Sequence, residues 1–526
     1  MRAENSAKNI FTGIAGRIIS MVLAFVVRTV FIKLLGEEYL GINGLLSSVF
    51  TVLNLAELGF GSAILYAMYK PAAEDDREQI KSLLRFFRNT YRIVGGVFLG
   101  LGLLLLPFLD YLVKGSSGDV NLRIIYVLYL LETTGSYWFF VYATSVVNAD
   151  QKGYALAGIS YLSSLGTTLA RIAVLFLLRA TPVLCFYVYA ALGVITTVLS
   201  NVLMYGKTVR MYPWILEKDV RPLPSEEKTA IKKNVVGLAT NKVCMVLNDG
   251  IDSTIVSAFI GLAQEGIFSN YLMLRQYISQ FISTVFGALT ASVGNLCAVE
   301  TTEKKEEFFQ SLQLTYFWVY GFCAICFWTL YDSFIVGVWL RDTKWLLTDF
   351  EVFLLCFNFL IEGIAGALVK YRDTNGLFWK TKYRYIASSV LNVLLSIVLT
   401  GPLHMGVAGA LLGTTVSLTV MLGFDPVLVY REVFRKKAGG YYKMYFGYLA
   451  LALATGAAVH ILMLPFRAYT FGNFLVRMLA CILVPNGLWY LLFRKDVRFL
   501  YLKGMILGLA KKICRRLTGG NGTKGL

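Results

Sequence analysis

The sequence predicts an all-α polytopic membrane protein with fourteen transmembrane helices: two six-helix lobes in a parallel pseudo-two-fold repeat, plus two C-terminal helices. The 526 residues are 57% hydrophobic and only 16% charged, with a mean hydropathy of +0.62, whereas soluble domains carry about 25% charge. The apolar runs exceed the roughly 20 residues of a spanning helix and are too long for the ~10-residue strands of an outer-membrane barrel. Connections on one predicted side of the membrane also carry many more Lys and Arg residues than those on the other side.

The predicted spans follow one another through short connections. They cover residues 10–35, 41–69, 91–113, 121–148, 153–178, 182–208, 229–260, 265–297, 309–337, 345–371, 380–401, 404–432, 441–464 and 470–493. Arg17 and Arg28 interrupt the first run and no A-x-A site follows it, so it does not resemble a cleavable signal peptide. We expect it to be retained as a helix.

The distribution of basic residues predicts the orientation. Connections on the side of the two termini hold 37 of the 50 Lys and Arg residues, and the opposite connections hold seven. Because cytoplasmic connections are enriched in Lys and Arg, both termini are expected in the cytoplasm. The net charge of +18 is then mostly a consequence of topology, and we expect no nucleic-acid partner.

A weak internal repeat predicts the domain organisation. FIKLLGEEYLGINGLLSSVF (31–50) and AFIGLAQEGIFSNYLMLRQY (258–277) both pass from a helix end, over a short acidic turn, into Gly-Ile. The copies begin six spans apart, so they have the same orientation, and an axis along the membrane normal would relate the lobes. The expected regions are an N-lobe (1–208), a cytoplasmic linker (209–228), a C-lobe (229–432), helices thirteen and fourteen (433–493) and a basic amphipathic tail (494–526).

Two segments outside the spans have an apolar stripe at helical spacing beside a charged face. They are residues 74–91 and 495–517. This pattern is typical of helices that lie on a membrane surface and are attracted by anionic lipids. We expect both segments to lie on the inner leaflet.

Basic residues deep in spans form the candidate substrate site. They are Arg17, Arg28, Arg171, Lys242 and Arg275. Each would cost about 2.5–3.5 kcal/mol facing lipid, so we expect them to face a cavity. Arginine suits phosphate because its guanidinium donates two parallel hydrogen bonds. Glu57 is assigned to the same site, and the alternative is structural pairing of these cations with Glu57, Glu132 or Glu362.

Helix 229–260 also contains candidate cation-coupling residues. Asp249 and Asp252 are three residues apart and adjacent on the helix surface, and Lys242 lies seven residues before Asp249. Acidic clusters of this kind hold Na⁺ or exchange protons, although the lysine and the aspartates can also satisfy one another. The small residues of GVAGALLGTTVS (406–417) favour close helix packing.

Motifs for other chemistry are missing from the sequence. There is no Walker A motif, the two histidines are far apart, and no predicted external connection exceeds about a dozen residues. A membrane polymerase would need a larger external catalytic loop. We therefore expect no enzymatic activity and no cofactor other than a coupling Na⁺ or H⁺.

Several stretches resemble the Wzx-type polysaccharide flippases of the MOP exporter superfamily. YLGINGLLSSVFTVLNLAELGFGSAILYAMYKP (39–71) resembles their second helix, and NDGIDSTIVSAFIGLAQEGIFSNYLML (248–274) is similar to their seventh helix and the turn after it. Asn392-x-x-x-Ser396, followed by GVAGALLGTTVS, resembles their eleventh and twelfth helices. The likeness covers nearly the whole chain.

The resemblance implies export of an undecaprenyl-pyrophosphate-linked oligosaccharide across a bacterial plasma membrane, with a polysaccharide polymerase and glycosyltransferases as possible partners. The related lipid II flippases have cavity arginines on helices one and eight, which here carry Arg17, Arg28 and Arg275. They also have a sodium site on helices seven, eleven and twelve, which would correspond to the region of Asp249, Asp252 and Asn392. The alternatives are a lipid II flippase, a MATE-like cation-coupled drug antiporter and a membrane enzyme such as a polymerase or acyltransferase.

Overall fold

The computed structural model describes residues 19, 21–53, 65, 67–68, 71–72, 74–111, 120–150, 152–217, 220–229, 231, 251–287, 300–375, 377–501 and 504. These residues are nearly all helical and include no β-strand. Eight of their helices are long and apolar enough to cross a membrane, or nine if one bent pair counts as a single span. The all-α membrane class is confirmed, and the full number of fourteen helices stays a prediction.

Several helices closely match the predicted spans. In chain order the α-helices are α2 (Glu37–Leu53), α4 (Arg77–Leu105), α5 (Leu122–Trp138), α6 (Thr144–Ala149), α7 (Tyr154–Leu177), α8 (Pro182–Met211), α10 (Leu262–Gly287), α12 (Thr302–Phe334), α13 (Asp349–Ile364), α14 (Gly366–Thr374), α15 (Phe378–Thr400), α16 (Gly406–Val429), α17 (Gly439–Leu462) and α18 (Phe471–Phe493). Residues 21–35 and 251–259 are also helical. The bounds of α7, α8, α15, α17 and α18 agree with the prediction within three residues.

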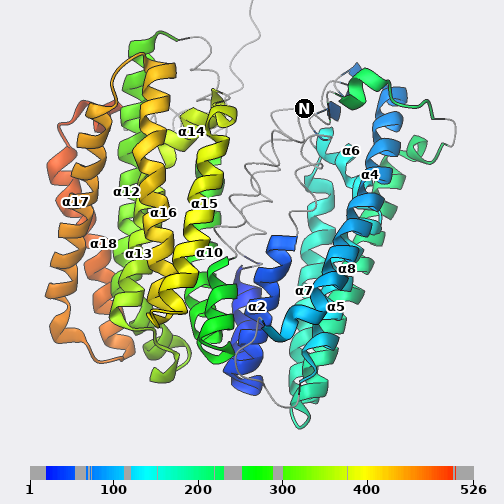
Figure 1. The fold of residues 1–526 in the computed structure, drawn as a ribbon, viewed down its shortest axis with the longest axis horizontal. Helices are drawn as coiled ribbons and strands as arrows, with labels where there is room; N and C mark the ends of the chain where they lie inside the picture. Colours follow the sequence, from blue (N-terminus) through cyan, green and yellow to red (C-terminus); the bar gives the residue numbers. More distant parts are fainter. Residues whose placement is uncertain are drawn as a thin grey trace, which may run out of the picture. The chain divides into compact units, whose positions relative to one another are not determined.

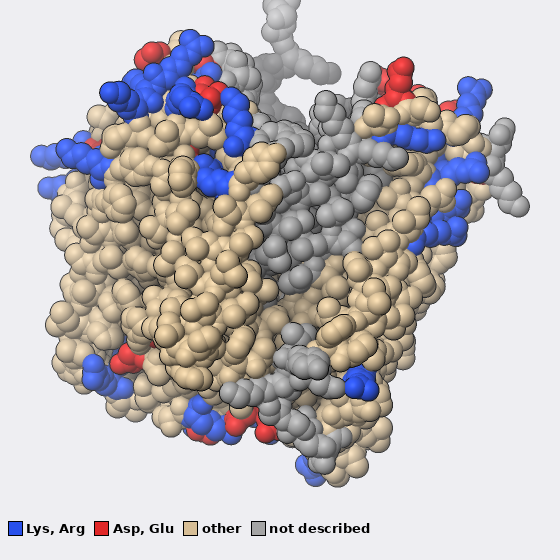
Figure 2. All heavy atoms as spheres, in the orientation of Figure 1, with Lys and Arg blue, Asp and Glu red and all other residues tan. Residues whose placement is uncertain are grey.

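The chain divides into two compact units, and neither is continuous in sequence. Unit 1 contains residues 1–284 and 382–414, and unit 2 contains residues 285–381 and 415–526. Figure 2 shows that, on the face in view, charged side chains in each unit gather at the ends of the helices and leave an uncharged band between them. Such a band is what the hydrocarbon layer requires of a spanning protein. The division into six-helix lobes and a C-terminal pair stays a prediction.

In unit 1, helix α5 packs against α4 and α8, and α7 packs against α8 (Figure 1). An aromatic cluster joins α2 to α5, where the rings of Phe50 and Tyr126 stack with centroids 5.2 Å apart. Tyr126 is fully buried, and its hydroxyl donates a 2.8 Å hydrogen bond to the carbonyl of Gly102 on α4. Its polar atom is therefore satisfied inside an apolar core.

In unit 2, helix α12 packs against α13, α17 and α18 (Figure 1). Trp489 of α18 is fully buried against Phe317 of α12, and its indole N–H donates to Thr455 Oγ1 at 3.1 Å. The predicted span 345–371 is a broken helix, because α13 and α14 meet at an angle of 40°. The predicted helices thirteen and fourteen are present as α17 and α18.

The predicted surface helix 74–91 is not a separate element, which corrects the expectation. Its residues from Arg77 onward are the first turns of α4, which continues to Leu105 without interruption. The apolar stripe, including Leu83 and Phe87, is buried in the protein. Lys81 and Ser82 contact the 217–221 segment through Glu217 Oε2 and the Arg221 carbonyl. The stripe therefore packs against protein, whereas its pattern alone is equally typical of lipid contact.

The tail predicted at 495–517 is described only at residues 495–501 and 504. Asp496 caps its beginning, because Asp496 Oδ1 accepts a 2.8 Å hydrogen bond from the backbone N–H of Arg498. The Arg498 side chain also hydrogen-bonds this carboxylate and lowers the pKa of Asp496. The remaining tail residues lie outside the described part of the chain.

The two copies of the predicted repeat contact each other within unit 1. Gly36 and Gly261, 225 positions apart, both have positive φ, at 90° and 134°. A Cβ at Gly41 would overlap the carbonyl of Leu262, and a Cβ at Gly266 would overlap the carbonyl of Glu37. Gly41 corresponds to Gly266, and Glu37 corresponds to Leu262, because each pair is also 225 positions apart. Each segment therefore places its glycine against the equivalent carbonyl of the other segment. A two-fold related pair of segments has this reciprocity.

Candidate functional site

Arg28, on helix 21–35, directs its guanidinium towards α10. Its Nε donates to Asn270 Oδ1 at 2.8 Å, and its Nη2 donates to Ser269 Oγ at 2.7 Å. Both acceptor residues are buried, and both are neutral. The hydrogen bonds therefore fix the guanidinium inside unit 1 and leave its positive charge uncompensated by these two partners.

A carboxyl group lies in the same region. Glu265, in the first turn of α10, is fully buried and interacts electrostatically with Arg28. Gly44 of α2 leaves space for it, because a Cβ there would come within 2.8 Å of Glu265 Oε1. Glu265 lies at the edge of a predicted span and was not among the predicted site residues. The sequence feature that could have identified it is its spacing of four residues from Ser269, because residues four apart lie on the same face of a helix.

Arg171 of α7 forms a second, half-buried cationic group. Its Nη2 is 4.0 Å from Glu132 Oε1 on α5, and its guanidinium lies over the ring of Tyr189, 4.5 Å from the centroid. Gly193 of α8 makes this approach possible, because a Cβ there would overlap the Glu132 carboxylate. The Nε of Arg171 is buried and has no hydrogen-bond partner in the described part of the chain. Glu132 is thus one of the three acids foreseen as structural partners.

Tyr189 connects these two cations. Its ring contacts Phe31 of helix 21–35 with centroids 5.1 Å apart, and both Arg28 and Arg171 interact with it electrostatically. On α5, the Tyr129 hydroxyl donates a short hydrogen bond to Asn43 Oδ1 of α2. Two of the predicted cavity arginines therefore lie around one tyrosine, in a polar region built from helices of unit 1.

The other predicted substrate-site residues are not all placed. Arg275 is half-buried on α10 and has no hydrogen bond or ion pair to another residue that the structure describes. The described residues do not include Arg17, Lys242 and Glu57. The expected stripe of Arg17 and Arg28 along one helix therefore remains a prediction.

Asp252 and Asn392, two of the predicted cation-coupling residues, are joined through α16. Thr414 Oγ1 donates to Asp252 Oδ2 at 2.9 Å and accepts from Asn392 Nδ2 at 3.1 Å. Ser396 Oγ lies 3.3 Å from Asn392 Oδ1 and 3.2 Å from the carbonyl of Ala410. These side chains provide neutral and anionic oxygen atoms from three helices of unit 1. Asp249 lies outside the described residues.

The small residues of α16 have the packing role that the sequence predicts. A Cβ at Gly413 would overlap Ser396 Oγ, and a Cβ at Gly409 would lie 2.7 Å from the backbone of Leu399. The close approach brings Thr414 to α15. From the sequence, this stretch was expected to have a packing role. Thr414, whose hydroxyl bridges Asp252 and Asn392, was not among the predicted site residues.

Solved structures of membrane transporters share this fold. The lipid II flippase MurJ, in an inward closed conformation, aligns over 92% of this chain and 98% of its own, with 16% identity and a TM-score of 0.63. The MATE transporter VcmN of Vibrio cholerae aligns over 85% of this chain and 99% of its own, with 13% identity and a TM-score of 0.56. An inward-facing multidrug MATE transporter of the MOP superfamily aligns over 78% and 94%, with 13% identity and a TM-score of 0.56. The chain has the fold of the MOP superfamily.

No protein-family model matches the sequence, and no curated protein shows significant similarity to it. At these identities the structural likeness establishes the MOP fold and no finer assignment. The expected fold is thus confirmed, while membership of the MOP superfamily and of its Wzx group stays a proposal.

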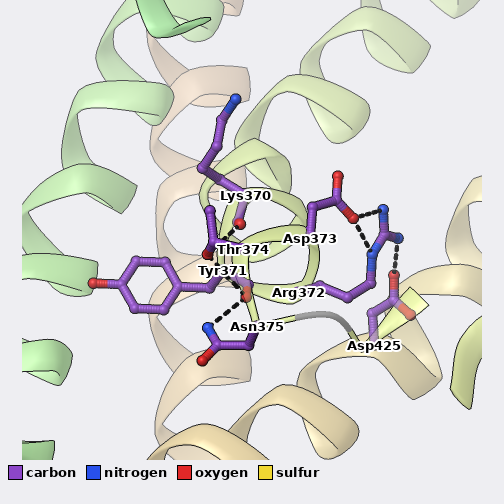
Figure 3. A network of polar contacts seen from close by, with 7 residues as sticks. All are labelled: Lys370, Tyr371, Arg372, Asp373, Thr374, Asn375 and Asp425. Carbon is purple, nitrogen blue, oxygen red and sulfur yellow. Dashed lines mark hydrogen bonds and ion pairs between the residues drawn. The ribbon is translucent and has the colours of Figure 1, made fainter. Parts of the chain in front are cut away.

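Two arginines in unit 2 of this MOP fold have structural partners. Figure 3 shows the Arg372 guanidinium of α14 between two carboxylates, Asp373 and Asp425, with Nη1 3.4 Å from Asp425 Oδ2 on α16. Arg477 of α18 is buried and donates to Ser333 Oγ and to the Phe466 carbonyl. Arg477 lies within a predicted span and was not selected; its contacts hold α18 and α12 together.

Proposed function

We propose that the protein is a Wzx-type flippase that moves a polyprenyl-pyrophosphate-linked oligosaccharide from the cytoplasmic to the outer leaflet of a bacterial plasma membrane. The observation that carries the proposal is the pair of half-buried arginines, Arg28 and Arg171, around Tyr189 in a MOP fold. A cation held within apolar helices is costly, so it is retained where it has a partner or a task. No covalent bond changes during this transport.

The pyrophosphate would bind these guanidinium groups in the cavity that the sequence predicts. Arg171 has a buried Nε without a partner among the described residues, and Arg28 faces two neutral acceptors. Arg171 therefore retains a free donor for phosphate oxygens beside Glu132. The neutral hydrogen-bond acceptors of Arg28 leave its charge to be shared between Glu265 and a bound phosphate. The polyprenyl chain would remain in lipid while the lobes alternate between inward and outward access.

The membrane potential favours this direction of transport. Moving one negative charge out of a negative-inside cell is favourable by about 2.3 kcal/mol per 100 mV. An anionic pyrophosphate carries more than one such charge at neutral pH. The potential can therefore assist export without nucleotide hydrolysis, in agreement with the missing Walker A motif.

A coupling Na⁺ or H⁺ would act at the oxygen cluster of Asp252, Asn392, Ser396 and Thr414. The buried carboxylate and the neighbouring hydroxyl and amide oxygens are hard ligands of the kind that Na⁺ prefers. Asp252→Asn removes the charge at nearly constant volume, and it should abolish the response of export to sodium or to the proton gradient. Identical ion dependence in the wild-type protein and the variant would leave the potential as the only driving force.

Gene deletion in the source organism tests the proposed substrate. Undecaprenyl-linked oligosaccharide should accumulate inside the cell and surface polysaccharide should be lost, while peptidoglycan synthesis continues. Plasmid-borne wild-type protein should restore the surface polysaccharide. Unchanged lipid-linked intermediates after deletion would contradict the proposal.

The fold likeness to MurJ favours a lipid II flippase as the second candidate. That function predicts rescue of a strain depleted of its own lipid II flippase and arrest of peptidoglycan synthesis after deletion. The oligosaccharide flippase predicts neither result. The deletion strain and the strain depleted of its own lipid II flippase therefore distinguish the two candidates.

A further inference from the structure

A cavity of about 340 Å³ lies in unit 1, away from the arginines around Tyr189. Its walls come from α4, the turn at 141–143, the last turns of α8 and the 215–220 segment. The side chains that give it chemical character are Lys81, Arg85, Arg88, Tyr142, Tyr205 and Glu217, which together we call the basic pocket. Its volume is at the small end of the range for ligand sites.

The basic pocket has an excess of positive charge. Lys81 is only 5% exposed, and its Nζ is 2.7 Å from Glu217 Oε2 and 2.5 Å from Glu78 Oε1. Glu217, the single carboxylate among the described lining residues, is therefore already paired with this lysine. Among the described residues, no second carboxylate lines the pocket beside the guanidinium groups of Arg85 and Arg88.

The two arginines differ in how they are held. Arg85 Nη1 donates a 3.2 Å hydrogen bond to the carbonyl of Val220, which orients its side chain along the 215–220 segment. Arg88 Nε is buried and has no hydrogen-bond partner among the described residues. A buried guanidinium N–H without an acceptor is unfavourable, so the site favours a ligand that supplies acceptor oxygens.

We propose that the basic pocket binds the phosphate of a small phosphorylated group, with Arg85 and Arg88 donating to its oxygens. Arginine donors match the geometry of phosphate, and the hydroxyls of Tyr142 and Tyr205 offer further polar contacts to an attached group. The pocket lies at the end of α4 that is predicted to be cytoplasmic. The phosphate belongs either to an anionic lipid headgroup of the inner leaflet or to a soluble compound, and in both cases it would join α4 to the 215–220 segment.

Binding to purified full-length protein tests the proposal with two probes, inorganic pyrophosphate and phosphatidylglycerol. Calorimetry in detergent measures pyrophosphate binding, and native mass spectrometry measures retained phosphatidylglycerol. The Arg85→Gln/Arg88→Gln variant should weaken binding of at least one probe about ten-fold or more, since two charge-assisted hydrogen bonds are lost. Loss of pyrophosphate binding identifies a soluble ligand, and loss of phosphatidylglycerol identifies a lipid.

Two control variants outside the basic pocket test whether the loss of binding is specific to Arg85 and Arg88. Arg92→Gln removes an exposed cation one turn further along α4 that does not line the pocket, and it should bind both probes as the wild type does. Arg28→Gln removes a cation of the proposed transport site, so it can lose pyrophosphate binding at that site but should keep the binding that the Arg85→Gln/Arg88→Gln variant loses. An unaltered melting temperature of the double variant without ligand excludes misfolding. The proposal is overturned if neither probe binds, if the double variant binds both probes as Arg92→Gln does, or if Arg28→Gln alone removes all binding of both probes.

Discussion

At the scale of single residues, Arg372 and Asp425 form an ion pair that is almost completely buried in unit 2. Their side chains are 7% and 6% exposed. Removing one partner from a buried pair leaves the other charge uncompensated, at a cost of about 3–5 kcal/mol. Arg372→Ala should therefore lower the melting temperature of the detergent-purified protein markedly.

The double variant Arg372→Met/Asp425→Leu is the matched control for this prediction. It replaces both charges with apolar groups and should recover most of the lost stability, because such replacements are often neutral. Equal melting temperatures for the wild type and Arg372→Ala would show that the pair contributes nothing measurable.

The sequence predicted which residues are costly in a membrane but not their partners. The expectation that Arg28 and Arg171 lie inside the protein follows from hydration energies alone. That Arg28 is held by Asn270 depends on contacts between positions 242 residues apart, which no local pattern encodes. Asp425 was missed although it interrupts an apolar span beside Pro426, a signal of the same kind as the arginines.

At the scale of elements, the reciprocal glycine contact fixes α2 against α10. Gly41→Ala would place a Cβ against the Leu262 carbonyl and force the helices apart. Overpacking of this kind costs about 1–3 kcal/mol, so the thermal midpoint should fall. Gly96→Ala on α4 has open space around it and should raise the midpoint slightly, because alanine favours helix by about 1 kcal/mol. Similar midpoints for the two variants would contradict the close contact.

Helix ends were predicted well where a change of polarity coincides with a structural break. Helices α7, α17 and α18 are of this kind. The continuity of α4 was not predicted, because residues 74–91 and the following span differ in composition although no Gly or Pro separates them. The bend after α13 was also missed. There, Gly363 and Gly366 lie against tyrosine rings of α12 that leave no room for a Cβ, a packing effect without a local sequence pattern.

At the scale of the whole molecule, the distribution of basic residues predicts that the 209–228 linker is cytoplasmic and that the connection between α7 and α8 is external. A single cysteine replacing exposed Glu226 or exposed Arg179, in a background without other cysteines, tests both sides. In intact cells, an impermeant maleimide should label position 179 and not position 226. After permeabilisation both should react, and the reverse labelling in intact cells would invert the topology.

The central claim is that the protein moves a lipid-linked oligosaccharide with the help of Arg28. The direct measurement uses proteoliposomes loaded with that lipid and records the fraction of sugar that an impermeant glycosidase removes over time. The wild type and Arg92→Gln should increase this fraction well above that of protein-free vesicles. Arg28→Gln should not, and Arg28→Lys should recover part of the rate, because a single ammonium lacks the two-pronged guanidinium geometry. Wild-type vesicles that match protein-free vesicles, or an Arg28→Gln variant that transports at the wild-type rate, would contradict the account.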